Sequence, residues 1–289
     1  MTLHLTPLPS LMIEPAVRAA LAEDLGRAGD ITTQATVPEA AQARVLLNAR
    51  EAGRVAGLDC ARMAFRLVEP LLKVAVVKGD GADVMPGDTI AAIEGPARGI
   101  LTGERVALNF LGHMSGIATA TRAIARAIEG TKAHVCCTRK TTPGLRVFEK
   151  YAVRAGGGMN HRFGLDDAVL IKDNHIAMSG GIAAAIQRTR SVSGHMVKIE
   201  VEVDTLDQLD EVLIAGVDAV LLDNMTPDML REAVARIGGR AIAEASGRIT
   251  TETAPAIAAS GVDLISCGWI THSAPCLDIG LDFDSLTAL

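Results

Sequence analysis

Aromatic residues are scarce in this chain of 289 residues, which has one Trp, one Tyr and five Phe. Its formal net charge is -6, so an overall basic surface is missing as well. Proteins that bind nucleic acids generally combine basic patches with aromatic stacking platforms. The composition therefore argues against a nucleic-acid partner.

Long hydrophobic runs and cysteine motifs are also missing. Charged residues interrupt every apolar stretch before it reaches the roughly 20 residues that span a bilayer, and no basic leader with an apolar segment opens the chain. None of the five cysteines belongs to a C-x-x-C pair, which favours buried, reduced thiols over zinc ligands or disulfides. We therefore expect a cytoplasmic protein without a membrane partner.

Helical and strand-like patterns are mixed in the first part of the chain. Glycine and proline turns divide its later strands, as in an antiparallel layer of hairpins. A helical pattern then begins near residue 103, and we expect it to break at Gly112-His113-Met114-Ser115-Gly116. The other predicted elements are helices over residues 14–25 and 58–67, and strands over 43–50, 72–77, 82–85 and 89–93.

From residue 130 onward, apolar strands alternate with helices. This alternation predicts an α/β fold with a parallel sheet, most simply a β/α barrel of about six strands. The phrases Ala215-Gly216-Val217-Asp218 and Ser260-Gly261-Val262-Asp263 indicate two copies of one βα unit. The predicted strands are residues 133–138, 168–172, 197–203, 219–223, 241–244 and 264–267, and the helices 181–189, 206–215, 227–237 and 253–260.

These patterns predict three parts of the chain. Residues 1–112 are expected to form an α+β, sandwich-like N-terminal domain, and residues 113–273 a β/α barrel that carries the catalytic site. Residues 274–289 are expected to form a tail that packs back on the N-terminal domain.

Basic residues gather between Thr138 and His175, where seven bases face four acids. Arg139, Lys140 and Lys172 stand at the carboxyl ends of predicted strands, which converge on the active-site face of a β/α barrel. Any one of these cations could be an ordinary surface residue. Together with Arg162 they would repel each other in a partly dry site unless an anion neutralised them. The cluster therefore predicts an anionic substrate.

Acidic residues and glycines end the following strands. Glu202 and Asp223 could pair with these bases, or bind magnesium with the help of substrate phosphates, and the sequence supports both interpretations equally. Ser246-Gly247-Arg248 and Cys267-Gly268-Trp269 follow the last two strands, where barrels often bind phosphate through backbone N–H groups.

Two histidines and a glycine triplet accompany the basic cluster. His161 and His175 could serve as acid–base groups, bind a carboxylate, or orient their neighbours through hydrogen bonds, which is the commonest role. Gly156-Gly157-Gly158 lacks the spacing of a dinucleotide fingerprint. We expect these glycines to let Asn160-His161-Arg162 fold over the barrel mouth.

Several ordered phrases resemble the quinolinate phosphoribosyltransferase family, whose members are also called nicotinate-nucleotide pyrophosphorylase (carboxylating). The resemblance extends over nearly the whole chain. The phrases are Glu23-Asp24-Leu25-Gly26, Gly29-Asp30-Ile31-Thr32-Thr33, Gly103-Glu104-Arg105-Val106-Ala107-Leu108-Asn109-Phe110-Leu111, Thr138-Arg139-Lys140-Thr141-Thr142-Pro143-Gly144, Gly156-Gly157-Gly158-Met159-Asn160-His161-Arg162, Lys172-Asp173-Asn174-His175, Glu200-Val201-Glu202-Val203-Asp204 and Leu222-Asp223-Asn224.

The resemblance implies an enzyme of NAD biosynthesis. It would transfer phosphoribose from phosphoribosyl pyrophosphate to quinolinate, a pyridine dicarboxylate, and release nicotinate mononucleotide, pyrophosphate and CO2. Magnesium is the implied cofactor, and a homodimer the implied assembly. Arg105, which stands in the first turn of its predicted helix and opposes the helix dipole there, could be an ordinary solvated arginine or could complete the neighbouring subunit's site.

The resemblance also implies roles for individual residues. Lys140, Lys172, Glu202 and Asp223 would be catalytic, and Glu202 and Asp223 would bind the metal. The implied substrate-binding residues are Arg105, Thr138, Arg139, Lys140, His161, Arg162, Lys172, Glu202, Asp223, Ser246, Gly247, Arg248, Cys267, Gly268 and Trp269.

Three alternatives remain at this stage. A related phosphoribosyltransferase could act on another pyridine or heteroaromatic acid. A barrel lyase could form a Schiff base on Lys172, if the pKa of that amine were lowered. The third hypothesis is a carrier module of the lipoyl type, which needs a lysine at the tip of a hairpin. Lys78 precedes its turn and does not occupy such a tip.

Overall fold

The computed structural model describes residues 5–287 of the chain and divides into two compact units. The first unit comprises the described residues up to Ala120, Val147–Gly157 and the described residues from Ser273, and the second comprises Thr121–Arg146 and Gly158–His272. The expected boundary at residue 112 therefore falls inside the first unit. Within residues 5–287, no helix has both the length and the apolar character needed to cross a bilayer.

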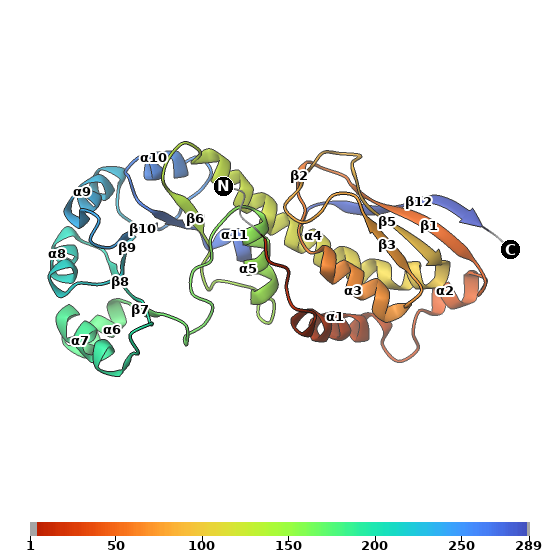
Figure 1. Cartoon of the computed structure of the whole chain (residues 1–289), viewed down its shortest axis with the longest axis horizontal. Coiled ribbons are helices and arrows are strands. Elements are labelled where there is room, and N and C mark those ends of the chain that lie inside the picture. The colour runs from red at the N-terminus through yellow and green to blue at the C-terminus, as the bar shows by residue number, and fades with distance from the viewer. Residues whose placement is uncertain (1–4, 288–289) are drawn as a thin grey trace. The chain divides into compact units, whose positions relative to one another are not determined.

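The first unit contains a four-stranded antiparallel sheet in the order β12-β1-β5-β3. Alternate residues of β1, from Ala43 to Ala49, are buried, as expected for a strand with one face on the core. Figure 1 shows α3 and α4 running along this sheet. The strands are β1 (Gln42–Ala49), β3 (Lys73–Val76), β5 (Thr89–Pro96) and β12 (Ile279–Thr287), and β2 (Gly53–Arg54) pairs separately with β4 (Asp83–Val84).

Helices complete the first unit, and α1 packs on α3. The described part of the expected tail, residues 274–287, contributes β12, which pairs with β1 along its length. Residues 288 and 289 of that tail lie outside the described residues. The helices are α1 (Ser10–Leu25), α2 (Ile31–Thr36), α3 (Leu58–Val68), α4 (Ala97–Ala127) and α5 (Arg146–Ala155). The residues of α4 from Thr121 onward and the first residue of α5 belong to the second unit.

The predicted break at residues 112–116 is wrong, because α4 is continuous over 31 residues. Its glycines serve close packing. A Cβ atom on Gly116 would lie 2.0 Å from the carbonyl oxygen of Pro275, and one on Gly112 would lie 3.1 Å from the carbonyl oxygen of Leu277. The Leu277 amide also donates a hydrogen bond to the Gly112 carbonyl at 2.9 Å. Glycine at these positions lets the chain after residue 273 approach the helix backbone.

This contact predicts that Gly116→Ala destabilises the protein. A glycine-to-alanine change in a helix normally stabilises it by about 0.5–1 kcal/mol, but here the methyl group would collide with main-chain atoms. Overpacking of this kind costs about 1–3 kcal/mol. Denaturant unfolding monitored by circular dichroism should show this loss, and a smaller one for Gly112→Ala, whose methyl group has more room. A Gly116→Ala protein as stable as the wild type would contradict the packing argument.

Two side-chain hydrogen bonds explain why part of α5 belongs to the first unit, which the sequence did not predict. Tyr151 donates through its hydroxyl to Asp80 Oδ2 at 2.7 Å, and His113 Nε2 lies 3.0 Å from Glu149 Oε1. Burial is the main reason that the pKa of Asp80 is raised. These contacts join segments that are distant in sequence, so no local sequence pattern predicts them.

The second unit contains six parallel strands in the order β6-β11-β10-β9-β8-β7. Helices line the outside of these strands in Figure 1. The strands are β6 (His134–Cys136), β7 (Val169–Ile171), β8 (Ile199–Val203), β9 (Ala219–Asp223), β10 (Ile242–Ser246) and β11 (Leu264–Ser266). The helices are α6 (Asp173–Ser179), α7 (Ile182–Val192), α8 (Leu206–Ala215), α9 (Pro227–Ile237), α10 (Ala254–Ala258) and α11 (Trp269–His272).

This arrangement confirms the predicted fold class, an antiparallel α+β unit together with a parallel, TIM-like β/α unit. No strand ladder within residues 5–287 joins β6 directly to β7. Met159 instead forms a parallel bridge with Cys136 of β6, and its amide donates to the Val135 carbonyl at 2.8 Å.

The two similar phrases occupy equivalent positions in the second unit. Gly216 and Gly261 both have positive φ, 72° and 89°, and each follows a helix. The carboxylates two residues later then accept hydrogen bonds from strand amides, Asp218 from Ile199 and Asp263 from Ala243, both at 2.9 Å. The two phrases therefore form the same type of helix-to-strand connection in two repeats of the βα unit.

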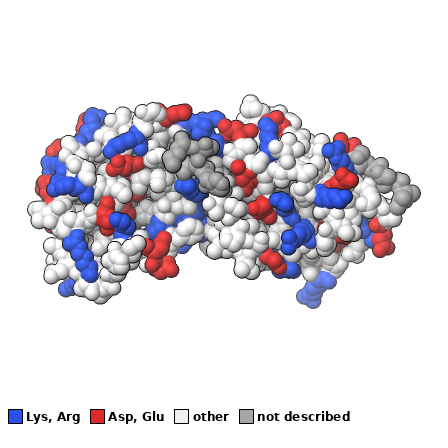
Figure 2. All heavy atoms as spheres, in the orientation of Figure 1, with Lys and Arg blue, Asp and Glu red and all other residues white. Residues whose placement is uncertain are grey.

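None of the five cysteines forms a disulfide, and four of the five are buried. The expectation of buried thiols is wrong only for Cys276, which is exposed. On the face drawn in Figure 2, acidic and basic side chains are interspersed and do not form a continuous basic surface.

Candidate active site

Two adjoining cavities, of about 410 and 340 Å³, lie at the carboxyl ends of the strands in the second unit. Every barrel residue to which the resemblance assigned a role lines at least one of them. The larger is lined by Thr138, Arg139, Lys140, His161, Arg162, Leu170, Lys172, Glu202, Leu221, Asp223, Glu244, Ser246 and Ser266. The smaller shares Thr138, Lys140, Asp223, Ser246 and Ser266 with it and adds Asn224, Gly247, Arg248, Ile249, Cys267, Gly268, Trp269 and His272.

Two guanidinium groups face the larger cavity. Burial, and next the charge of Arg139, lower the pKa of Arg162. Arg162 Nη1 donates to the Ala168 carbonyl at 3.0 Å. Arg139 Nε is buried, and no hydrogen-bond partner for it occurs among residues 5–287. A buried donor without a partner is costly, so this pair of cations favours an anionic ligand.

Lys172 and Glu202 bring opposite charges to the same cavity. Lys172 follows β7 and Glu202 belongs to the neighbouring β8, and the ammonium group forms an ion pair with the Glu202 carboxylate. The Lys172 side chain is 44% exposed and that of Glu202 16%. The lysine can therefore reach a ligand without leaving a deeply buried carboxylate unpaired.

The loop after β10 depends on a glycine. Gly247 has φ of 108°, and a Cβ atom there would lie 2.3 Å from Asn224 Oδ1. The backbone N–H of Asn224 donates a hydrogen bond to the Ser246 carbonyl at 3.0 Å. Arg248 also has a positive φ, 48°. Both strain and close approach therefore require glycine at residue 247. The close approach of Gly247 to Asn224 and the hydrogen bond to the Ser246 carbonyl hold residues 246–248 against the end of β9.

The loop after β11 closes the smaller cavity on the other side. A Cβ atom on Gly268 would lie 2.9 Å from Cδ of Lys140, so glycine leaves room for that lysine. Trp269 Nε1 donates to the Ile249 carbonyl at 2.9 Å, and Thr271 Oγ1 donates to the Lys140 carbonyl at 2.7 Å. Burial raises the pKa of Cys267 to about 12, so its thiol stays protonated and is a poor nucleophile.

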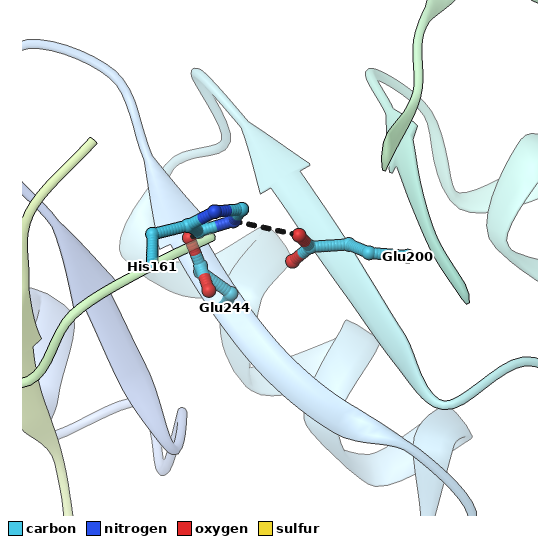
Figure 3. A group of neighbouring side chains, drawn as sticks. All are labelled: His161, Glu200 and Glu244. Atoms are coloured by element: carbon cyan, nitrogen blue, oxygen red, sulfur yellow. Dashed lines mark hydrogen bonds and ion pairs between the residues drawn. The ribbon is translucent and has the colours of Figure 1, made fainter. Parts of the chain in front are cut away.

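His161, Glu200 and Glu244 form a cluster beside the larger cavity (Figure 3). His161 Nε2 lies 2.8 Å from Glu200 Oε2 and 3.6 Å from Glu244 Oε1. Glu244 Oε1 also accepts a hydrogen bond from the Ser266 hydroxyl. Burial, and next the charge of Glu200, raise the pKa of Glu244 to about 7.

Sequence reasoning did not select Glu200 or Glu244 as site residues. Two signals were present, because Glu244 ended a predicted strand, and Glu200 is two residues from Glu202, which places both on one face of β8. Asn224 and His272 were missed too. Asn224 lay within a quoted phrase, whereas His272 carried no signal in the sequence.

Two other predicted residues lie outside the cavity linings. His175 Nδ1 accepts a hydrogen bond from the Lys172 amide at 2.9 Å, which is the orienting role considered for it. Arg105 belongs to α4 in the first unit and is not among the residues that line either cavity.

Comparison with known proteins identifies relatives along most of the chain. Residues 30–115 match the family model described as quinolinate phosphoribosyl transferase, N-terminal domain, and residues 117–282 match its C-terminal domain. A probable nicotinate-nucleotide pyrophosphorylase [carboxylating] of Bacillus subtilis is 45% identical over 90% of this chain and 89% of its own length. The Mycobacterium leprae nicotinate-nucleotide pyrophosphorylase [carboxylating] is 45% identical over 92% of this chain and 95% of its own length.

A solved structure is similar to the whole chain. The nicotinate-nucleotide pyrophosphorylase from Francisella tularensis superposes with a TM-score of 0.93 at 37% identity. The match covers 97% of this chain and 99% of that one.

Proposed function

The chain belongs to the quinolinate phosphoribosyl transferase family, and we propose that it transfers phosphoribose from phosphoribosyl pyrophosphate to quinolinate. Nicotinate mononucleotide, pyrophosphate and CO2 are the products, and the reaction belongs to NAD biosynthesis. The larger cavity would bind the pyridine dicarboxylate, and the smaller one the phosphorylated sugar.

The observation that carries this proposal is the pair of guanidinium groups in the larger cavity. Arg139 has a buried Nε without a partner among the described residues, and its charge contributes to the lowered pKa of Arg162. A ligand with two carboxylates would neutralise the two guanidinium groups and relieve the repulsion between them. Lys172 adds a third cation in the same lining.

Phosphoribosyl pyrophosphate would occupy the smaller cavity and the residues shared by both. Lys140 and Arg248 supply positive charge there, and the backbone of residues 246–248 and 267–268 offers N–H groups to a phosphate. Thr138, Ser246, Cys267 and Trp269 shape this part of the proposed site.

Glu202 and Asp223 fit a magnesium ion that is bound together with pyrophosphate. Both are carboxylates on neighbouring strands, both line the larger cavity, and Asp223 also lines the smaller one. Magnesium usually takes one or two protein carboxylates and completes its shell with phosphate and water oxygens. When bound, the ion would neutralise charge that develops on the departing pyrophosphate.

The residues of the chain contribute mainly by orienting the two substrates relative to each other. During transfer, the bond between the ribose carbon and pyrophosphate breaks, and a bond forms between that carbon and the pyridine nitrogen. Arg139, Arg162 and Lys172 would hold quinolinate so that its nitrogen faces the ribose, while Lys140 stabilises the leaving group. The adjacent carboxylate then departs as CO2, because the positive ring nitrogen stabilises the electron pair left on the ring carbon. That carbon takes up a proton from solvent, which gives nicotinate mononucleotide.

Incubation with quinolinate, phosphoribosyl pyrophosphate and magnesium tests this function. We expect CO2 and pyrophosphate in equal amounts. A parallel reaction with nicotinate, which lacks the second carboxylate, should yield neither product at a comparable rate. Failure to release both products from quinolinate, with pyrophosphate release from nicotinate, would favour the related phosphoribosyltransferase.

The other two alternatives lose support from local contacts. The ammonium group of Lys172 forms an ion pair with the Glu202 carboxylate, which engages the side chain that a Schiff base would require. Lys78 Nζ pairs with Asp88 Oδ2 at 2.7 Å, which ties down the side chain that a carrier module would modify.

A homodimer is the assembly proposed for this enzyme, with Arg105 reaching the active site of the neighbouring subunit. Arg105→Ala and Lys172→Ala homodimers should each be inactive, because every site lacks one residue. Mixing the two proteins under conditions of subunit exchange should restore activity, up to about a quarter of the wild-type rate per site if half the dimers are mixed and one site in each is intact.

Product formation by the mixture measures this recovery. The matched control is a mixture of Arg139→Ala and Lys172→Ala proteins, whose changes fall in the same subunit's site. If both mixtures recover equally, Arg105 does not act across subunits.

A cytoplasmic location completes the proposal. The five cysteines form no disulfide, as is usual for proteins of a reducing compartment.

A further inference from the structure

Arg146, the first residue of α5, connects two loops of the second unit. Its Nε donates to Thr141 Oγ1 at 3.0 Å, and its Nη1 donates to the Phe163 carbonyl at 2.9 Å. Its Nη2 lies 3.5 Å from the Arg139 carbonyl. These three acceptors are uncharged, and Arg146 is not among the residues that line either cavity. Its guanidinium group therefore links the two loops from outside the cavity walls.

The two loops carry the arginines of the larger cavity. Arg139 lies in the first loop, residues 137–145, and Arg162 lies in the second, residues 160–168. Neither loop contains a helix or a strand. The charge of Arg139 contributes to the lowered pKa of Arg162, so the two guanidinium groups repel each other. That repulsion favours a larger separation of the loops, and the contacts of Arg146 oppose it.

The second loop is shaped around the carbonyl group that Arg146 contacts. The backbone N–H groups of Phe163 and Gly164 donate to Asp167 Oδ2 and Oδ1, at 2.6 and 2.9 Å. The Phe163 carbonyl belongs to the same peptide group as the Gly164 N–H. Asp167 and Arg146 therefore hold that peptide group at its N–H and at its carbonyl. Arg162 immediately precedes this fixed turn, so its distance from the first loop depends on Arg146.

We propose that Arg146 is a positioning residue that holds the loops of Arg139 and Arg162 together and so makes the site selective for a ligand with two neighbouring carboxylates. This inference deepens the proposed function and rests on it for the identity of the ligand. A dicarboxylate needs both guanidinium groups at a fixed separation, and a separation set before binding avoids the cost of bringing the loops together. A monocarboxylate needs only one of these groups and gains nothing from the link.

Equilibrium binding of quinolinate and of nicotinate, measured by calorimetry, tests this selectivity. Arg146→Leu removes all three contacts and should weaken quinolinate binding about tenfold, the effect of one hydrogen bond of a charged group. Nicotinate has one carboxylate and should bind with unchanged affinity, so the preference for quinolinate should fall about tenfold. The matched control is Arg188→Leu, which removes the same charge from an exposed position on α7 and should change neither affinity.

Arg146→Lys separates the link between the loops from the effect of charge. Lysine keeps the positive charge but lacks the planar fork, so it cannot reproduce the contacts to both loops. We expect its quinolinate affinity to lie near that of Arg146→Leu. Full recovery of quinolinate affinity with lysine would overturn the proposal. Weaker binding of quinolinate, nicotinate and phosphoribosyl pyrophosphate alike by Arg146→Leu would also overturn it, because that pattern indicates a general attraction of anions.

Thr141→Val is a milder test that keeps Arg146 in place and serves even if Arg146→Leu does not fold. It removes the acceptor of Nε and the hydroxyl that lies 3.4 Å from the Arg139 carbonyl. Quinolinate binding should weaken about threefold, a fraction of the effect of one hydrogen bond, with nicotinate binding unchanged. An unchanged preference for quinolinate would refute the proposal. Failure of the wild-type protein to bind quinolinate and to release CO2 and pyrophosphate would instead refute the proposed function.

Discussion

Arg139→Ala is expected to lower kcat/KM for quinolinate by about 100-fold or more, the effect of losing two hydrogen bonds between charged groups. The guanidinium combines a buried Nε that has no partner among the described residues with a place beside Arg162. Its loss leaves one substrate carboxylate without its donors. Initial rates at varied quinolinate, with phosphoribosyl pyrophosphate saturating, measure the change.

Two further variants serve as controls for Arg139→Ala. Arg139→Lys keeps the charge but loses the planar fork, so its activity should fall between alanine and wild type. Arg188→Ala removes an exposed arginine that lines neither cavity, and should leave the rate unchanged. An Arg139→Ala enzyme with a normal KM and kcat for quinolinate would rule out the larger cavity as the dicarboxylate site.

Asp223→Ala should reduce kcat by about 100-fold or more, a typical result when a group that stabilises charge in the transition state is removed. Asp223 lines both cavities, and with Glu202 it offers the carboxylate oxygens that suit magnesium. The variant should also need more magnesium for half-maximal rate, which a titration of initial rate against magnesium concentration would measure.

Asp223→Asn is the informative companion to that variant. It keeps the size of the side chain and one oxygen but loses the charge, so the magnesium requirement should still rise. Asp228→Asn changes an 86% exposed carboxylate on α9 and should have no effect. An unchanged magnesium requirement in both Asp223 variants would indicate that Asp223 acts by pairing with the bases of the cavity.

The barrel half of the chain was predictable because its signals are local. Apolar runs alternate with helical patterns, and helices α8 and α9 and strand β9 have the predicted bounds. Strand ends then followed from strand positions, which is why Arg139, Lys172, Glu202 and Asp223 could be assigned to one mouth before the fold was known. The family resemblance added the substrates, which no pattern of hydrophobicity contains.

Glycines show the limit of local reasoning. Gly112 and Gly116 suggested a helix break, since glycine weakens an isolated helix. Only the packed structure shows that residues 275–277 run against that face of α4, so the same glycines permit a contact. Helix propensity depends on the residue and its local backbone alone. It contains no information about a packing partner that lies more than 150 residues later in the sequence.

The sequence by itself determined the fold class, the family and the charged residues of the barrel mouth, because each of these follows from residue types at short spacing. Tertiary structure alone decided the contacts made across distant segments. It brought Glu200, Glu244 and Ser266 beneath His161, and it left Arg139 Nε without a partner among the described residues. Hydrogen-bond partners and burial depend on which strands become neighbours, and that order is a property of the folded sheet.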